Sequence, residues 1–345
     1  MKIKNQILYF VTILSVALMT FSCNNDDSKE VVKLNSIVEI AKADPANFSI
    51  LLDALKKTSL DVTLSNPGSY TVFAPTNAAF TAAGYTSASI NAMVVPTDNV
   101  AIANLKLVLQ NHVLGVGTKS DDLLASGYFK TFAFYKSSAT ATSGANLNMF
   151  INRPAADVLL NGGATNGGAK ITSADIQASN GVVHVIDAVL KLPTLINQIT
   201  ANPALSSLLG LVLTTPQVPV FTILNGATST AAITLYAPNN DAFTAAKAAG
   251  GYLIGKTDAQ IINILRYHME TGNRTASSAT SYTSSTTTTD VSVSTLYTPN
   301  KFTILVGTVK IKDIVATSNA TIKTINVQGT NGVIQIIDKV LQPFL

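Results

Sequence analysis

Three histidines are the side chains with the greatest capacity for chemistry, because histidine serves as a general base and as a metal ligand. His112 and His268 end apolar stretches with helical spacing, and His184 lies inside an apolar run typical of a strand. A catalytic triad or a metal site requires several such groups to converge, and the spacing gives no such cluster. We therefore interpret the histidines as buried side chains with hydrogen-bond partners. We predict no catalytic residue, no metal site and no cofactor.

Two aspartates and one glycine-rich stretch are also interpreted as structural features and not as parts of an active site. Asp187 and Asp338 each follow an apolar run, and a single carboxylate at each place suits a bond to backbone amides better than paired acid–base chemistry. The glycine-rich residues 163–168 are followed by Ala169 rather than by the lysine of a phosphate-binding loop, so we expect a hairpin there. The sequence thus predicts that the chain is not an enzyme, and a hydrolase would need convergent carboxylates that it does not suggest.

The composition describes a globular chain with room for two domains. Its 345 residues suffice for two cores, and 47% hydrophobic against 12% charged residues excludes a disordered or coiled-coil chain. The formal net charge is +4, without a Lys/Arg-rich stripe interleaved with aromatics. We therefore predict no nucleic-acid partner.

The amino terminus predicts export followed by lipid attachment. Residues 1–22 have a basic start and an apolar run, which is the layout of a secretory signal and is short for a membrane span. Cys23, the single cysteine of the chain, comes next. This arrangement resembles the lipobox of bacterial lipoproteins, whose cysteine receives acyl chains that hold the protein in a membrane. The alternative is a plain signal peptide or an uncleaved anchor with a cysteine nearby by chance.

Residues 23–32 are polar and acidic, which indicates a solvated tether. The stretch resembles the one that directs lipoproteins to the cell surface in Bacteroidetes-type bacteria. We therefore expect an outer membrane lipoprotein exposed at the cell surface. A periplasm-facing or secreted protein is the alternative.

An internal repeat organises the rest of the chain. The block YTVFAPTNAAF at residues 70–80 recurs as ITLYAPNNDAF at residues 233–243. The block SNGVVHVID at residues 179–187 recurs as TNGVIQIID at residues 330–338. Between these blocks, the matched elements LQNH and LRYH end in His112 and His268. Three matching blocks in one order predict two copies of one domain.

Each copy begins with an apolar stretch interrupted by an Asx-Pro step, Asp44-Pro45 or Asn202-Pro203. Because proline is poorly tolerated inside a helix, each step predicts two short helices that meet at a corner. We place the domains at residues 33–193 and 194–345, with so short a junction that they lie close together.

Within each copy the expected order is helices, a short buried strand, more helix and then several strands. Strands at Val72-Phe73 and Leu235-Tyr236 lead into turns whose Thr and Asn oxygens can cap the next helix. Helices on one side and mostly antiparallel strands on the other make an α+β fold.

These blocks are similar to those of the fasciclin domain family. Residues 70–80 resemble its first signature, residues 180–187 its second, and the two histidines stand in its Tyr-His element. The resemblance spans residues 33–345. It implies two tandem fasciclin-like domains, each a wedge-like β-sandwich of about seven strands with packed helices. It also implies cell adhesion, matrix contact or ligand display without enzyme activity.

The resemblance suggests four candidate contact residues for adhesion or ligand binding. Asp175 and Ile176 match an Asp-Ile pair used by some adhesive domains of the family, and Tyr267 and His268 complete its Tyr-His element.

Neither copy carries the whole set. The first has Asn111 before its histidine, and the second has Asn326 and Gln335 where the first has Asp175 and His184. The general role is therefore supported, and no specific receptor is.

Two functions remain open at this point. The first is a non-enzymatic surface lipoprotein that mediates adhesion or binds an extracellular protein or glycan. The alternative is capture of a glycan or small molecule, which a concave pocket with exposed aromatics would favour. The Ser/Thr-rich residues 276–297 are expected to form a flexible loop that enters a strand near Val291, and edge strands with polar faces are the alternative.

Overall fold

The computed structural model describes residues 34–345, apart from 124–125, 137–143, 155–156, 277–288 and 316–317. The described residues form one compact unit, Leu34–Leu345. The expected signal, Cys23 and the tether lie outside them, as does much of the Ser/Thr-rich segment.

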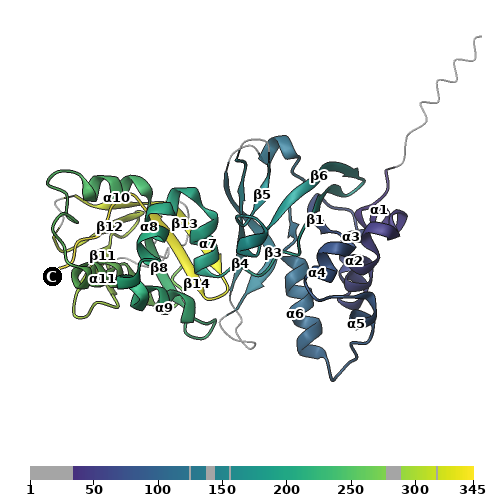
Figure 1. The fold of residues 1–345 in the computed structure, drawn as a ribbon, viewed down its shortest axis with the longest axis horizontal. Helices are drawn as coiled ribbons and strands as arrows, with labels where there is room; N and C mark the ends of the chain where they lie inside the picture. Colours follow the sequence, from purple (N-terminus) through teal and green to yellow (C-terminus); the bar gives the residue numbers. More distant parts are fainter. Residues whose placement is uncertain (1–33, 124–125, 137–143, 155–156, 277–288, 316–317) are drawn as a thin grey trace, which may run out of the picture. The chain divides into compact units, whose positions relative to one another are not determined.

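The first repeat contains a helical layer and seven strands (Figure 1). Its helices are α1 (Ile37–Ala43), α2 (Pro45–Lys57), α3 (Leu60–Ser65), α4 (Asn77–Ala82), α5 (Ser87–Asn91) and α6 (Asn99–Gln110), with 3-10 turns η1 (Ser120–Leu123) and η2 (Ala164–Asn166). Its strands are β1 (Tyr70–Pro75), β2 (Val113–Leu114), β3 (Gly127–Tyr135), β4 (Ala145–Asn152), β5 (Leu159–Leu160), β6 (Ala169–Ala178) and β7 (Gly181–Ile186).

The second repeat has a similar order of elements, with two helices instead of three between its first two strands. Its helices are α7 (Leu195–Ala201), α8 (Ser206–Val212), α9 (Val218–Gly226), α10 (Asn240–Lys247) and α11 (Asp258–Tyr267), with 3-10 turns η3 (Pro203–Leu205) and η4 (Thr215–Gln217). Its strands are β8 (Ile233–Pro238), β9 (Met269–Thr271), β10 (Val291–Ser294), β11 (Lys301–Ile304), β12 (Lys310–Lys312), β13 (Ala320–Gly329) and β14 (Gly332–Ile337).

The two signature blocks of each repeat lie side by side as parallel strands. β1 pairs with β7, which places Phe73 opposite His184, and β8 pairs with β14, which places Tyr236 opposite Gln335. The other described strand pairs are antiparallel. The predicted α+β fold with about seven strands per domain is confirmed.

The two sheets differ in closure. In the first, the pairing of Leu114 in β2 with Thr131 in β3 completes a closed barrel, β1 to β7. In the second, the described strands form an open sheet in the order β10-β11-β12-β13-β14-β8-β9.

The Asx-Pro corners are confirmed. Asp44 Oδ1 accepts a hydrogen bond from the amide of Asn47 at 3.3 Å, and Asn202 Oδ1 accepts one from the amide of Ala204 at 2.9 Å. In each case proline then starts the next helical segment, where its missing N–H is no loss.

The turn after each first strand caps a helix as expected. Thr76 Oγ1 accepts from the amide of Ala79 at 3.2 Å, and Asn239 Oδ1 accepts from Ala242 at 2.9 Å. The hairpin expected at the glycine-rich residues 163–168 is present, because β5 and β6 are antiparallel neighbours joined by residues 161–168. Asn161 begins this connection with a left-handed φ of 48°.

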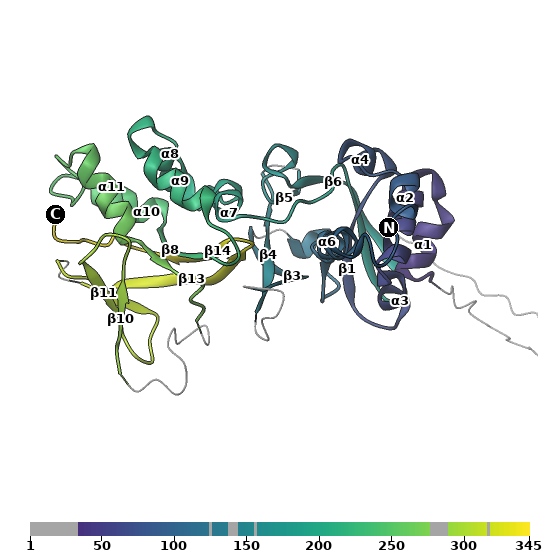
Figure 2. The same cartoon turned by 90° about the horizontal axis from the view of Figure 1, so that it is seen from below.

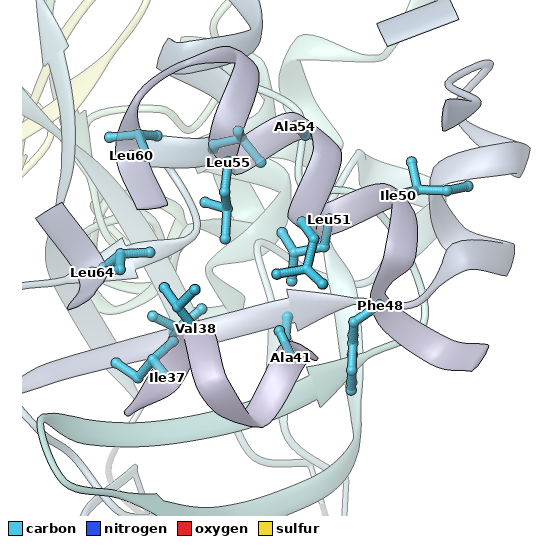
Figure 3. Packing of buried hydrophobic residues seen from close by; sticks show 14 of the residues in the cluster. Ile37, Val38, Ala41, Phe48, Ile50, Leu51, Ala54, Leu55, Leu60 and Leu64 are labelled. Atoms are coloured by element: carbon cyan, nitrogen blue, oxygen red, sulfur yellow. The ribbon is translucent and has the colours of Figure 1, made fainter. Parts of the chain in front are cut away.

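Helices and strands both contribute to the cores. In the first domain, apolar side chains of α1, α2 and α3 converge on the sheet (Figure 3), and Val38, Leu55 and Leu64 are at most 3% exposed. A cavity of about 20 Å³ remains among them, which is too small for an organic ligand. In the second domain, α8 to α11 lie on one side of strands β8, β13 and β14 (Figure 2).

Candidate functional site

His112 and His268 join the end of a helix to the end of a domain. Nδ1 of His112 bonds to the carbonyl of Val108 at 2.7 Å, and its Nε2 accepts from the amide of Leu190 at 2.9 Å. His268 makes the same two bonds, to Ile264 at 2.7 Å and from Leu341 at 2.8 Å. Both rings therefore carry their proton on Nδ1 and are neutral.

Burial keeps both rings neutral. It lowers the pKa of His112 and of His268 to about 4, and the bond to a backbone carbonyl offsets only part of this effect. A fully buried ring with both nitrogens bonded to backbone has no free site for a proton transfer or a ligand. These histidines are structural, as the sequence indicated.

His184 and its counterpart Gln335 perform one task with different chemistry. Nδ1 of His184 accepts from the amide of Asp175 at 3.2 Å, and its Nε2 bonds to the carbonyl of Thr118 at 2.9 Å. In the second domain, Gln335 accepts from the amide of Asn326 at 2.9 Å and donates to the carbonyl of Arg274 at 3.0 Å. The replacement keeps both hydrogen bonds and removes the titratable ring. Burial lowers the pKa of His184, so that ring also favours its neutral form.

Asp175 occupies a β-bulge that requires a special backbone conformation. Asp175 and Asn326 have φ of 62° and 57°, a left-handed region that Asp and Asn tolerate better than other non-glycine residues. The Asp175 carboxylate accepts from the amide of Ser120 at 2.8 Å and from its hydroxyl. Burial by itself raises the pKa of Asp175, but the bonds from Ser120 and the nearby charge of Lys119 act in the opposite direction, and the net pKa is lowered.

The Asn-Gly step of the second signature ties the last hairpin to the helical layer. Asn180 accepts from the amide of Ile37 at 3.0 Å and donates to the carbonyl of Leu64 at 2.7 Å. Gly181 has a φ of 152°, and a Cβ there would lie 2.1 Å from the carbonyl oxygen of Tyr70. The glycine of the signature therefore allows the backbone of β7 to lie close to that of β1, which any side chain would prevent.

The second domain repeats these bonds. Asn331 accepts from the amide of Leu195 at 2.8 Å and donates to the carbonyl of Leu224 at 3.0 Å. The aspartates that end the two signature blocks bind amides, as expected: Asp187 accepts from the amide of Lys170 at 2.8 Å and Asp338 from that of Thr321 at 2.7 Å.

The four predicted contact residues lie in different domains and environments. Asp175 and Ile176 are adjacent in β6 and partly exposed. Tyr267 and His268 are 0% and 1% exposed, and the Tyr267 hydroxyl donates to the carbonyl of Lys301 at 2.8 Å. A partner on the surface of the folded second domain cannot reach these two rings directly. The contact role of Asp175 and Ile176 stays a prediction.

The junction of the two domains is built from neutral amides. Gln198 of α7 donates to the carbonyl of Asn148 in β4 at 2.6 Å, and the Asn148 side chain accepts from the amide of Gln328 in β13 at 2.8 Å. Asn166 and Asn197 exchange hydrogen bonds at 2.8 and 3.1 Å. The short connection predicted between the domains thus brings them into direct contact.

Two tyrosines of β3 reach across this junction. The hydroxyl of Tyr128 accepts from Asn202 at 3.0 Å, and the hydroxyl of Tyr135 donates to the carbonyl of Ser229 at 2.9 Å. Each tyrosine borders a hollow. The hollow beside Tyr128 has a volume of about 560 Å³ and the hollow beside Tyr135 about 390 Å³.

The larger hollow, which we call the junction groove, is the strongest candidate binding site. Its lining is Ser126, Gly127, Tyr128, Phe150, Asn152, Asn202, Pro203, Ala204 and Thr324. The sequence did not predict this groove, because the lining residues come from four separate segments of the chain. Of these segments, the sequence singled out only the Asn202-Pro203 step, as a helix corner. No spacing in the sequence brings such segments together.

The described residues contain neither a cluster of metal ligands nor a single helix that could cross a membrane. No group of three or more His, Cys, Asp or Glu side chains that could hold a metal ion occurs in that part of the chain. No single helix within the described ranges is long and apolar enough to cross a membrane, while Pro203–Val212 and Thr215–Gly226, bent by 84°, meet that test of length and composition as a pair.

Comparison with known proteins assigns the family. The fasciclin domain model matches residues 46–193 and 205–343. The chain belongs to the fasciclin domain family. Protein sll1483 of Synechocystis sp. is 31% identical over 158 residues, which cover 46% of this chain and 74% of that protein.

Other fasciclin domain relatives are much longer proteins. Transforming growth factor-beta-induced protein ig-h3 of Sus scrofa is 31% identical over 166 residues, 46% of this chain and 20% of that protein. Human periostin is 24% identical over 318 residues, 89% of this chain and 31% of that protein. The chain thus spans a third or less of the length of these two relatives.

Among solved structures, a FAS1 domain pair from the insect cell adhesion molecule Fasciclin I is similar, with a TM-score of 0.48 and 16% identity. It covers 88% of this chain and 95% of that chain.

Proposed function

We propose that this tandem fasciclin protein is a non-enzymatic surface lipoprotein that mediates adhesion or binds an extracellular ligand. One observation carries the proposal: the polar residues that recur in both fasciclin domains are used to hold the fold. The rings of His112 and His268 and the carboxylates of Asp187 and Asp338 bind backbone groups, and so do His184 and the Gln335 that stands in its place. Such a chain offers surfaces for recognition. Membership in a family with adhesion molecules supports the same role.

Asp175 and Ile176 are the proposed protein-contact residues of the first domain. The matched test is Asp175→Asn, because Asn326 occupies the same left-handed bulge in the second domain. The variant keeps the backbone conformation and an acceptor for Ser120 but removes the charge. Loss of binding to matrix proteins with unchanged thermal unfolding supports a contact role, and unchanged binding contradicts it.

The adhesion role is tested with the full chain purified in detergent, against immobilised matrix proteins, a glycan array and cells that produce the protein. Saturable binding to matrix or cells is expected. Saturable glycan binding without matrix or cell binding would contradict the adhesion role and favour ligand capture.

Acyl chains on Cys23 are the proposed membrane anchor, with display at the outer surface. Metabolic labelling with a clickable palmitate analogue should mark the wild-type chain and leave Cys23→Ser unmarked. Protease added to intact cells should then remove the fasciclin domains. A chain that resists the protease until the cells are opened contradicts surface display.

A further inference from the structure

We propose that the junction groove binds a neutral saccharide. The groove has a volume of about 560 Å³, which lies inside the range of roughly 300–1,000 Å³ usual for small-ligand sites. Strands β3 and β4 of the first domain form one wall, and the helix corner after α7 together with Thr324 of β13 forms the other. The site therefore exists only in the tandem arrangement.

The lining has hydroxyl and amide groups and no charged side chain. Hydroxyls and carboxamides both donate and accept hydrogen bonds, which suits the hydroxyl groups of a sugar. An anionic or cationic ligand would find no counter-charge among the lining residues. The chemistry thus selects uncharged, hydroxyl-rich molecules.

An aromatic surface complements these polar groups. Tyr128 packs edge-on against Phe150, with ring centroids 4.8 Å apart and planes at 60°. Phe150 is 3% exposed, so it supports Tyr128, which is partly exposed, from behind. Together with Pro203 and Ala204, Tyr128 gives the groove an apolar surface. A pyranose ring, with an apolar face of C–H groups and a polar rim, matches this combination.

The walls are fixed before a ligand arrives. Asn202 donates to the Tyr128 hydroxyl at 3.0 Å, which joins the two walls, and the Oδ1 of Asn202 caps the helix corner through Ala204. Asn148 of β4 binds the second domain through two further hydrogen bonds, accepting from the Gln198 side chain and from the amide of Gln328. Because the side chains are already ordered, binding loses little conformational entropy.

The test uses the full chain in detergent and saturation-transfer NMR with maltose, cellobiose, lactose and glucuronic acid. At least one of the neutral disaccharides is expected to bind saturably, and glucuronic acid is expected to bind at least ten-fold more weakly. Ala204→Trp adds bulk at an exposed position and should abolish binding without unfolding the domain. Thr324→Val removes one hydroxyl at constant shape and should weaken binding about five-fold, the value of one hydrogen bond.

Thr303→Val, in β11 and outside the groove, is the matched control and should bind as the wild type does. Three results overturn the proposal: no neutral disaccharide binds, glucuronic acid binds equally well, or binding survives Ala204→Trp. The assay contains no cells and no matrix, so failure of the saccharide site and failure of the adhesive function are separate results.

Discussion

The two fasciclin domains differ at one matched place in their cores, which is apolar in the first domain and polar and charged in the second. In the first domain, Phe73 of β1 and Leu114 of β2 belong to one apolar cluster and are at most 1% exposed. In the second, Tyr236 and Glu270 stand at these places, and the tyrosine hydroxyl donates to the carboxylate at 2.7 Å. Arg274 donates to both carboxylate oxygens at 2.7 and 2.9 Å. A buried carboxylate is stable in the core only when hydrogen-bonding and charged partners surround it, so the neighbours of Glu270 differ from those of Leu114 as well.

A second contrast lies in the helical layers. Residues 192–240, which include α7, α8 and α9, contain no Asp, Glu, Lys or Arg, whereas α1 to α3 contain residues such as Asp53, Lys56 and Asp61. Leu213 and Val218 in the second layer are 58% and 53% exposed. The repeat therefore constrains the buried face of each helix and leaves the outer face free to differ.

The largest expected effect comes from breaking the charged cluster. Glu270→Leu copies the first domain at one position but leaves the Tyr236 hydroxyl and the guanidinium of Arg274 without this carboxylate. We expect a loss of about 3 kcal/mol in the free energy of unfolding, measured by urea denaturation, because the buried Tyr236 hydroxyl loses an acceptor while Arg274, 40% exposed, can be hydrated. Adding Tyr236→Phe should recover part of it, because the pair then resembles Phe73 and Leu114. A Glu270→Leu variant as stable as the wild type would show that the cluster contributes nothing.

The matched histidines should make both domains sensitive to acid. The pKa of His112 and of His268 is about 4 in the folded chain against 6.5 unfolded, so the unfolded state binds protons first as pH falls. Their stabilisation is complete above pH 6.5 and is lost as pH falls toward 4. Between pH 6.5 and 5 we expect a loss of about 2 kcal/mol per histidine.

Urea unfolding at pH 7.5, 6 and 5 measures this loss. His112→Gln should reduce the pH-dependent part of the loss by about half while lowering stability at every pH. Equal stability of the wild type at pH 7.5 and pH 5 contradicts the neutral, buried state of these rings.

The exchange of His184 for glutamine should be nearly neutral. Gln335 shows that an amide can make both bonds at this place in the fold. We expect His184→Gln to change the free energy of unfolding by about 1 kcal/mol or less, whereas His184→Leu should cost about 1–3 kcal/mol because the amide of Asp175 loses its acceptor. Thermal unfolding of both variants decides the matter; equal losses would mean that packing, not hydrogen bonding, fixes this residue.

The smallest effect is expected on the uncharged helical face. Leu213→Lys places a cation at the end of α8 and Val218→Glu an anion at the start of α9, both favourable to the helix dipoles. Each should stabilise by about 0.3–1 kcal/mol and reduce self-association, measured by thermal unfolding and light scattering. The reversed charges, Leu213→Glu and Val218→Lys, are the control for the dipole effect. Equal melting temperatures for the two pairs would contradict it.

The sequence by itself determined the repeat, the α+β order, the helix corners and the structural role of the histidines. These features depend on local rules: proline interrupts a helix, Thr and Asn cap one, and matched positions take matched roles. Replacement of His184 by Gln335 was enough to indicate hydrogen bonding without titration. The glycine-rich residues 163–168 likewise indicated a hairpin, and they lie between the antiparallel strands β5 and β6.

Only the tertiary structure decided which side chains reach the surface and which meet across the domains. Nothing in the Tyr-His element said that Tyr267 would be fully buried under β11. The charged cluster around Glu270 and the junction groove around Tyr128 and Thr324 join residues that are distant or differently placed in the chain. Burial and long-range contact follow from how the elements pack, and local sequence patterns do not contain that information.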